Sequence, residues 1–262
     1  MPITSSSLVE LCRLLKIAEP TADTRPEPAF PHRRVRAGVH LVCAGQPFES
    51  LYVLNAGFMK ASLIGASGAE QVTAFPIRGD LIGADGLSAD RHPTGVVALT
   101  DCDVVVLPMN RIARIGHEHP EIARSLLRLI AGELVREQTM VATLSMPSAE
   151  ARVAHFLVEH GQRMKSLGFS DRAFELRMTR RDIGSYLSLQ LETVSRTFSA
   201  FARGGLIAVD RRSIRLLDVE ALRALDGFAR SPVARAPVRP SVAVPAGQAR
   251  AVPVERAMPI AA

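Results

Sequence analysis

The chain has 262 residues, of which 47% are hydrophobic and 22% charged, which is enough apolar material for one large domain or two ordinary ones. Its three cysteines, Cys12, Cys43 and Cys102, are odd in number and far apart, which argues against a secreted disulfide scaffold and favours the reducing cytoplasm. The first residues show no basic segment followed by an apolar stretch, and no apolar run approaches about 18 residues. The sequence therefore predicts neither a signal peptide nor a membrane partner.

The formal charge of +6 is concentrated in one segment. Between Arg172 and Arg215 there are nine arginines, no lysine and four acidic residues, so this stretch holds five of the six excess positive charges. A local basic patch is typical of proteins that bind the phosphate backbone of nucleic acids, although a solvated basic face has the same composition.

In chain order, residues 1–29 predict an N-terminal arm with one short helix at Leu8–Ile17. Residues 30–118 hold short β-type runs separated by Gly, Pro, Asn and Asp, with turn signals at intervals of about 8–12 residues. This spacing predicts an antiparallel β-barrel or jelly roll.

The period becomes helical over residues 119–146. Pro120 suits the first turn of a helix, and apolar residues then recur at spacings of three, four and seven up to Leu144. The apolar stripe could pack back on the chain's own β-domain, but pairing with the same helix of a second copy is favoured. The residues predicted for this homodimer contact are Ile122, Leu126, Leu129, Leu134, Glu137, Met140 and Val141.

Within that stripe, Glu137 is the one charged residue. If it faces its symmetry mate, like-charge repulsion would weaken the dimer; the alternative is a solvated position.

Residues 147–229 predict a third unit, after a hinge at Met146-Pro147-Ser148. A helix from Ala149 to Gln162 is followed by two short helices within 178–204, a hairpin around Asp210–Arg212 and a helix candidate at Val219–Ala229. Residues 230–262 are dominated by Pro, Ala, Val and Arg, which predicts a disordered, passive tail.

The two short helices carry the pattern with the clearest chemistry. Thr179 and Asp182 form a capping-box pair, and Gly184 allows close helix approach before a break at Ser188-Leu189. In the second helix, an apolar stripe leaves Glu192, Ser195 and Arg196 on the outside. The stripe consists of Leu191, Val194, Phe198 and Phe201.

Side chains of these three types read base edges in the major groove, because arginine pairs with guanine, glutamate accepts from cytosine and serine reaches either base type. The alternative interpretation is that Glu192 and Arg196, which are four residues apart, form only a weak surface salt bridge. Contacts to the DNA backbone are predicted for Thr179, Arg180, Gln190 and Thr193.

The E-T-V-S-R sequence at residues 192–196, the long helix before it and the run KASLIGASGAEQVTAFPIRGDLIGADGL resemble the family of the cyclic-AMP receptor protein and the FNR regulator, and FNR more closely. The resemblance covers about residues 30–225. It implies an α+β fold with an N-terminal antiparallel, cyclic-nucleotide-binding-like β-barrel or jelly roll, a long dimerisation helix and a C-terminal winged helix-turn-helix.

The resemblance also implies a function. A dimeric transcription regulator, an activator by analogy, would bind double-stranded DNA at a TTGAT-type rather than a TGTGA-type palindrome and contact RNA polymerase. Glu192, Ser195 and Arg196 would read each half-site, whereas Ser188 and Gln190 depart from the small residues common at those family positions. In FNR an acidic residue near the position of Glu137 opposes dimerisation.

Cofactors are not predicted. The region of a cyclic-nucleotide site holds Asp85 in place of the family's glutamate, Arg91 is displaced, and Pro93 removes a backbone donor, so cyclic AMP is not expected. Three cysteines without a Cys-x-x-Cys pair do not suit an iron–sulfur cluster, which normally takes four thiolates. The seven histidines include no closely spaced pair that suits a metal ion, and the sequence does not decide whether haem is bound.

No nucleophile–base constellation or phosphate loop is present, so an enzyme is not expected. The competing hypothesis is a ligand-binding regulatory subunit that uses the barrel without operator recognition.

Overall fold

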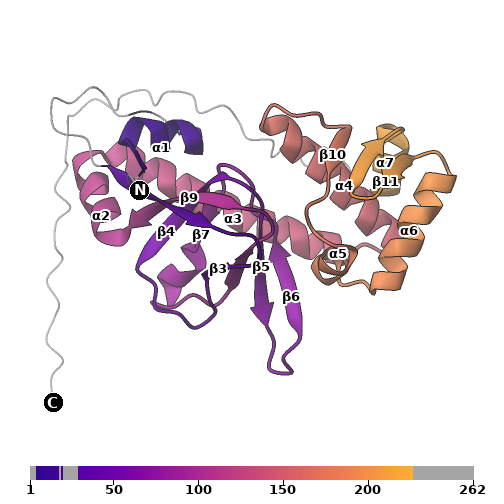
Figure 1. Ribbon diagram of the computed structural model, residues 1–262, viewed down its shortest axis with the longest axis horizontal. Coiled ribbons are helices and arrows are strands. Elements are labelled where there is room, and N and C mark those ends of the chain that lie inside the picture. The colour runs from indigo at the N-terminus through magenta and orange to yellow at the C-terminus, as the bar shows by residue number, and fades with distance from the viewer. Residues whose placement is uncertain (1–3, 18, 20–28, 227–262) are drawn as a thin grey trace, which may run out of the picture. The chain divides into compact units, whose positions relative to one another are not determined.

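The structure, a computed structural model, describes residues 4–17, 19 and 29–226, so the predicted tail and the last residues of the predicted helix at Val219–Ala229 lie outside it. A β-rich domain precedes a set of helices and a small three-stranded sheet (Figure 1). The elements of the β-rich part are β1 (Ser5–Ser6), α1 (Leu8–Leu15), β2 (Phe30–Val35), β3 (His40–Val42), β4 (Ser50–Ala56), β5 (Met59–Ile64), β6 (Glu70–Ala74), β7 (Leu81–Ile82), a 3-10 turn (Ala84–Ser88), β8 (Gly95–Ala98) and β9 (Cys102–Pro108). The elements that follow are α2 (Met109–Glu118), α3 (Pro120–Leu144), α4 (Ala149–Ser166), β10 (Ala173–Glu175), α5 (Arg180–Leu187), α6 (Leu191–Arg203), β11 (Ile207–Asp210), β12 (Ser213–Leu216) and α7 (Val219–Asp226).

The β-domain consists of two antiparallel sheets, one in the order β1-β2-β9-β4-β7 and one in the order β3-β8-β5-β6. Residues of both sheets share one apolar core, in which Leu54 and Val104 come from the first sheet and Met59 and Val96 from the second. Of the two folds that the sequence left open, this is the jelly roll rather than the closed barrel, because the sheets pack face to face and keep separate edges.

The N-terminal segment is part of this domain over its described residues, rather than the separate arm that the sequence predicted. β1 pairs with β2, with Ser6 opposite Phe30. Ser7 and Glu10 form a capping box at the start of α1, and one face of α1 packs into the core beside β4, β9 and α3. The buried residues of that face are Leu8, Leu11, Cys12 and Leu15.

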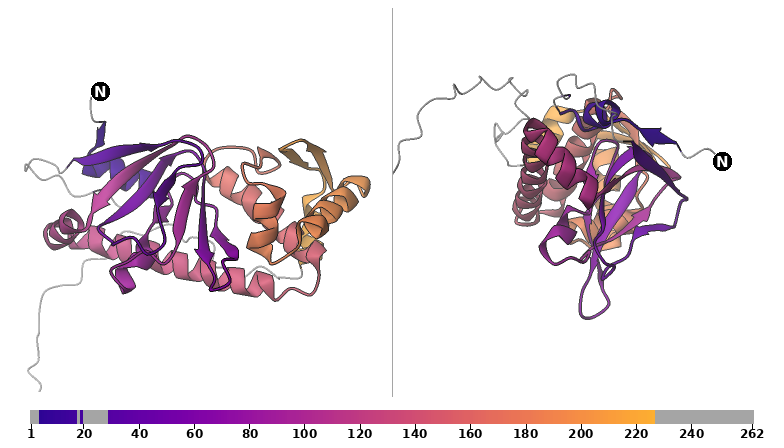
Figure 2. Two further views of the ribbon diagram at one scale, coloured as in Figure 1. Left: turned by 60° about the horizontal axis from the view of Figure 1, so that its bottom comes forward. Right: turned by 90° about the vertical axis from the view of Figure 1, so that its left-hand side faces the viewer.

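Helix α3 has the bounds that its periodicity predicted and runs alongside the β-domain (Figure 2). Its first turns bury Ile122 and Leu126 in the core shared with α1 and β9. Its other face leaves Leu127, Leu134 and Val141 with 66%, 56% and 66% of their surface exposed. Residues seven apart lie on one helix face, so these three form an apolar stripe open to solvent.

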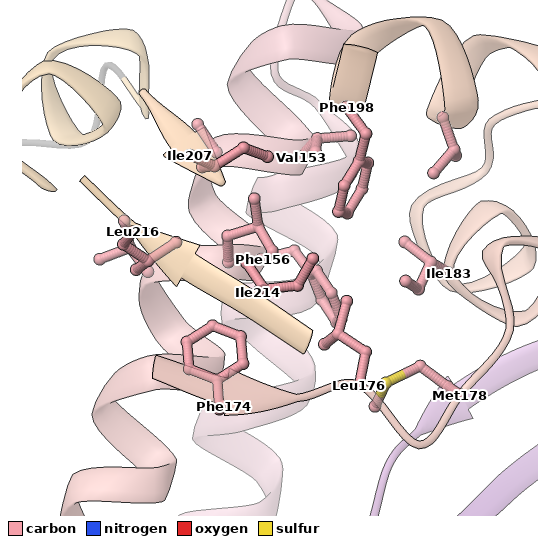
Figure 3. Packing of buried hydrophobic residues seen from close by; sticks show 14 of the residues in the cluster. Val153, Phe156, Phe174, Leu176, Met178, Ile183, Phe198, Ile207, Ile214 and Leu216 are labelled. Atoms are coloured by element: carbon pink, nitrogen blue, oxygen red, sulfur yellow. The ribbon is translucent and has the colours of Figure 1, made fainter. Parts of the chain in front are cut away.

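The C-terminal unit is a winged helix-turn-helix. Helices α4, α5, α6 and α7 surround a three-stranded sheet in the order β10-β12-β11, and its core joins α4 to the other elements through Val153 and Phe156 (Figure 3). The sequence predicted the hairpin β11–β12 but not β10, whose three residues are too few to show a period. Among the described helices, none is long and apolar enough to cross a membrane.

Candidate nucleic-acid interface

The turn between α5 and α6 follows from the local sequence. The Thr179 hydroxyl accepts from the backbone of Asp182 at 3.1 Å, and the Asp182 carboxylate accepts from the backbone of Thr179 at 2.8 Å, which confirms the predicted capping box. Helix α5 ends at Leu187, and its C-cap residue Ser188 lies in the left-handed region, with φ at 52°. A Cβ on Gly184 would lie 2.7 Å from the carbonyl oxygen of Leu189, so only glycine allows the chain to turn this tightly.

Helix α6 presents the three predicted base-reading side chains together. Its inner face buries Val194, Thr197, Phe198 and Phe201. Glu192, Ser195 and Arg196 are exposed in its N-terminal half. No ion pair joins Glu192 to Arg196 within the described part of the chain, so the surface salt bridge that the sequence left open does not form. Both charged groups face solvent in the N-terminal half of the helix.

The four residues predicted to contact the DNA backbone differ in their surroundings. Thr179 and Gln190 are exposed at the N-termini of α5 and α6, and Thr193 is half-buried. The Arg180 guanidinium lies over the Phe198 ring, 3.4 Å from its centroid, and burial lowers its pKa to about 10. Arg180 therefore stays charged at neutral pH, and it joins α5 to α6 through a cation–π contact.

The turn of the wing carries exposed positive charge, a feature that was not predicted for the hairpin around Asp210–Arg212. Arg211 and Arg212 connect β11 to β12, both are exposed, and Arg211 has φ at 52°. Arg215 follows, exposed, on β12. Consecutive arginines at the turn of a predicted hairpin were the signal that could have identified this second basic surface.

The β-domain residues do not fit a cyclic nucleotide. The Arg91 guanidinium donates to the carbonyl oxygen of Gly45 at 2.8 Å. The Asp85 carboxylate accepts from the Thr94 hydroxyl at 2.5 Å and from the backbone of Gly86 at 3.0 Å. The cation and the anion that such a ligand would need are thus engaged within the chain.

The cysteines lie in three different environments. Cys12 is buried in the core beneath α1, Cys102 is buried between the two sheets, and Cys43 is exposed. Burial raises the pKa of the Cys102 thiol, although hydrogen bonds with Thr100 and Phe58 oppose that shift. The described residues contain no group of three His, Cys, Asp or Glu side chains that could hold a metal ion, and three thiols do not supply the four ligands of an iron–sulfur cluster.

Comparison with known proteins gives two family matches. Residues 151–225 match the Crp-like helix-turn-helix domain, and residues 32–119 match the cyclic nucleotide-binding domain. These ranges correspond to the winged helix-turn-helix and to the jelly roll.

Characterised relatives span most of the chain. The transcriptional regulatory protein btr of Bordetella pertussis is 39% identical over 74% of this chain and 80% of its own length. The transcriptional activator protein anr of Pseudomonas aeruginosa is 34% identical over 84% of this chain and 91% of its own length. Among solved structures, FixK2 from Bradyrhizobium japonicum has a TM-score of 0.70 at 29% identity, covering 76% of this chain and 98% of that one. The jelly roll, the long helix, the winged helix-turn-helix and these relatives together show that the chain belongs to the Crp/Fnr family of transcription regulators.

Proposed function

We propose that this regulator binds a TTGAT-type palindrome in double-stranded DNA as a homodimer, with Glu192, Ser195 and Arg196 of each subunit reading one half-site. The observation that carries the proposal is the exposed cluster of these three side chains at the N-terminal half of α6, none of which pairs with another side chain of the described residues. Their donors and acceptors match base edges in the major groove. Contact with RNA polymerase, implied by the family resemblance, belongs to the same proposal.

Contacts to the DNA backbone are expected on either side of these three base-reading side chains. Thr179 and Gln190 stand exposed at helix N-termini, where the backbone N–H groups attract phosphate. The wing arginines Arg211 and Arg212 add positive charge beside them. Such contacts give affinity and register, whereas the three side chains of α6 give specificity.

Support for the dimer comes from the exposed stripe of Leu127, Leu134 and Val141. An apolar stripe with a seven-residue repeat on a helix of 25 residues suits a two-fold coiled coil. The predicted contacts Leu134, Glu137 and Val141 lie on this open face, while Leu129 and Met140 are half-buried against the subunit's own cores. Ile122 and Leu126 pack within the subunit, so the proposed interface is centred on residues 127–141.

The experiment is fluorescence anisotropy with protein purified in air and stripped of metal. The probe is a TTGAT/ATCAA palindrome, and the competitor is a TGTGA/TCACA palindrome of the same length at the same stated salt concentration, because phosphate contacts make affinity depend on salt. Tight binding with preference for the first duplex is expected. Equal affinity for both duplexes, or none for either, would refute the half-site assignment for the protein without an effector.

Glu137 gives a test of the dimer. It is exposed between Leu134 and Val141, so in the proposed coiled coil it faces its symmetry mate. We expect Glu137→Ala to tighten dimerisation about two- to fivefold, the size of exposed charge effects, as measured by analytical ultracentrifugation. Glu133→Ala is the matched control, because Glu133 is one turn earlier and pairs with Arg136 of its own subunit; an unchanged dissociation constant for Glu137→Ala would contradict the idea.

A further inference from the structure

The hairpin β5–β6 of the β-domain contacts the first helix of the helix-turn-helix through a half-buried lysine. The Lys60 ammonium lies 2.9 Å from the carboxylate of Glu70, its neighbour across the hairpin, and 3.0 Å from that of Asp182 on α5. The side chains of Lys60 and Asp182 are only 13% and 12% exposed. Breaking this largely enclosed pair would leave a partly buried charge without its partner, which opposes opening of the contact.

Both members of the pair stay charged. Burial opposes the charge on Lys60, but hydrogen bonds to Glu70 and Asp182 outweigh it and raise the pKa of the ammonium. Burial also opposes the charge on Asp182, yet hydrogen bonds from Thr179 and Lys60 lower the pKa of that carboxyl. Because Asp182 also caps α5 through Thr179, Lys60 is connected to the N-terminus of the helix that precedes the turn.

The outer edge of β6 makes a second set of bonds to α5. The Ser185 hydroxyl accepts from the backbone N–H of Val72 at 2.9 Å and donates to the carbonyl oxygen of Glu70 at 2.9 Å. The Gln71 amide donates to the carbonyl oxygen of Ser185. β6 is the last strand of its sheet, so Ser185 satisfies backbone groups that an edge strand otherwise leaves open.

A further contact holds α4, which precedes α5 in the same unit. Asp80, in the loop after β6, accepts from the Arg163 guanidinium at 2.5 Å, and Arg163 also donates to the carbonyl oxygen of Phe75 at 3.1 Å. Arg136 of α3 approaches Asp80 at 3.9 Å. The Phe75 ring packs against Tyr186 of α5, with centroids 5.2 Å apart. The β-domain therefore contacts the winged unit on two different helices, and two separated contacts oppose rotation about the hinge between α3 and α4.

We infer that Lys60 and Asp80 are positioning residues for DNA recognition, which fix the orientation of each helix-turn-helix relative to α3 and so set the spacing of half-sites that the dimer accepts. The inference rests on the proposed binding of a palindrome. Lys60 and Asp80 need not touch DNA for this role. A rigid connection lets the second recognition helix bind only where the spacing of the half-sites matches. A loose connection tolerates several spacings, but binding of the second half-site then adds less affinity.

The test measures binding to TTGAT palindromes whose central spacer is varied in steps of one base pair, with a single half-site duplex as reference. Each added base pair moves the half-sites apart by about 3.4 Å and rotates one against the other by about 35°. Wild-type protein is expected to lose about tenfold or more in affinity one step from its best spacer. Lys60→Met is expected to lose at most about threefold in affinity for each base pair added to or removed from the best spacer. It should bind the palindrome with the best spacer about tenfold more weakly than wild-type protein, and bind the single half-site with unchanged affinity.

Lys60→Arg should restore the wild-type profile because it keeps the charge. Lys165→Met is the matched control, since Lys165, near the C-terminal end of α4, forms an exposed ion pair with Asp171 of its own winged unit. Should Lys60→Met fail to fold by circular dichroism, Ser185→Ala removes the edge contact without leaving a buried charge. A wild-type spacer profile in the folded variants would overturn the inference while leaving the proposed function intact; no preference among spacers in wild-type protein would also overturn it, and no binding of wild-type protein to any duplex would overturn both.

Discussion

Arg196→Ala is expected to remove most of the discrimination between a TTGAT palindrome and a random duplex. The guanidinium is exposed in the second turn of α6, with Glu192 and Ser195 beside it. A bidentate contact from arginine to guanine contributes about 1–3 kcal/mol of discrimination. A two-fold dimer makes this contact twice, so the loss for the whole palindrome is about 2–6 kcal/mol if both half-sites are read alike.

Competition anisotropy with the specific and random duplexes at one salt concentration measures this loss. Affinity for random DNA should fall little, because that binding depends on the remaining exposed arginines. Arg203→Ala is the matched control, since Arg203 is exposed in the last turn of the same helix and away from its N-terminal half. A parallel fall on both duplexes for Arg196→Ala would assign Arg196 to the phosphate backbone instead.

The elements that the sequence predicted well are those with local signals. The bounds of α3 follow from Pro120 and a regular apolar period, and the start of α5 follows from the capping pair of Thr179 and Asp182. The exposure of Arg196 follows from the apolar stripe on the opposite face of α6. In each case the signal lies within a few residues of the feature that it predicts.

What the sequence could not predict depends on contacts between distant residues. Lys60 and Asp182 are 122 residues apart in the chain, and no period or motif connects them. The sequence predicts a phosphate contact for Arg180 from its place at a helix start, but it could not predict the position of Arg180 over the Phe198 ring, which requires the packing of two helices. The sequence predicts an arm that includes α1, because eight residues cannot show which core will bury them.

The pH dependence of stability provides a test of the winged unit that needs no DNA. His160 lies on α4, is 4% exposed, stacks on Phe156 and forms a T-shaped ring contact with Phe174. Its Nε2 atom has no hydrogen-bond partner among the described residues. Burial, with a smaller contribution from the charge of Arg163, lowers its pKa to about 4. The ring is therefore neutral in the folded protein throughout the range in which an unfolded histidine takes up a proton.

The sign of the effect follows from this difference in proton uptake. Below the unfolded pKa of about 6.5 the unfolded state binds the extra proton, so the free energy of unfolding falls as the pH drops from about 6.5 toward 4. Between pH 7.5 and pH 5, the titration of His160 alone should lower the free energy of unfolding by about 2 kcal/mol. We expect the free energy of unfolding of His160→Phe to fall by about 2 kcal/mol less than that of wild-type protein between pH 7.5 and pH 5. Urea unfolding at one protein concentration measures this difference, which does not depend on the stability of the variant at pH 7.5. His117→Gln, at an exposed position of α2, is the control and should keep the wild-type pH dependence. An equal fall in the free energy of unfolding for His160→Phe and wild-type protein would show that His160 is protonated in the folded state. The aromatic core around α4 would then be open to water.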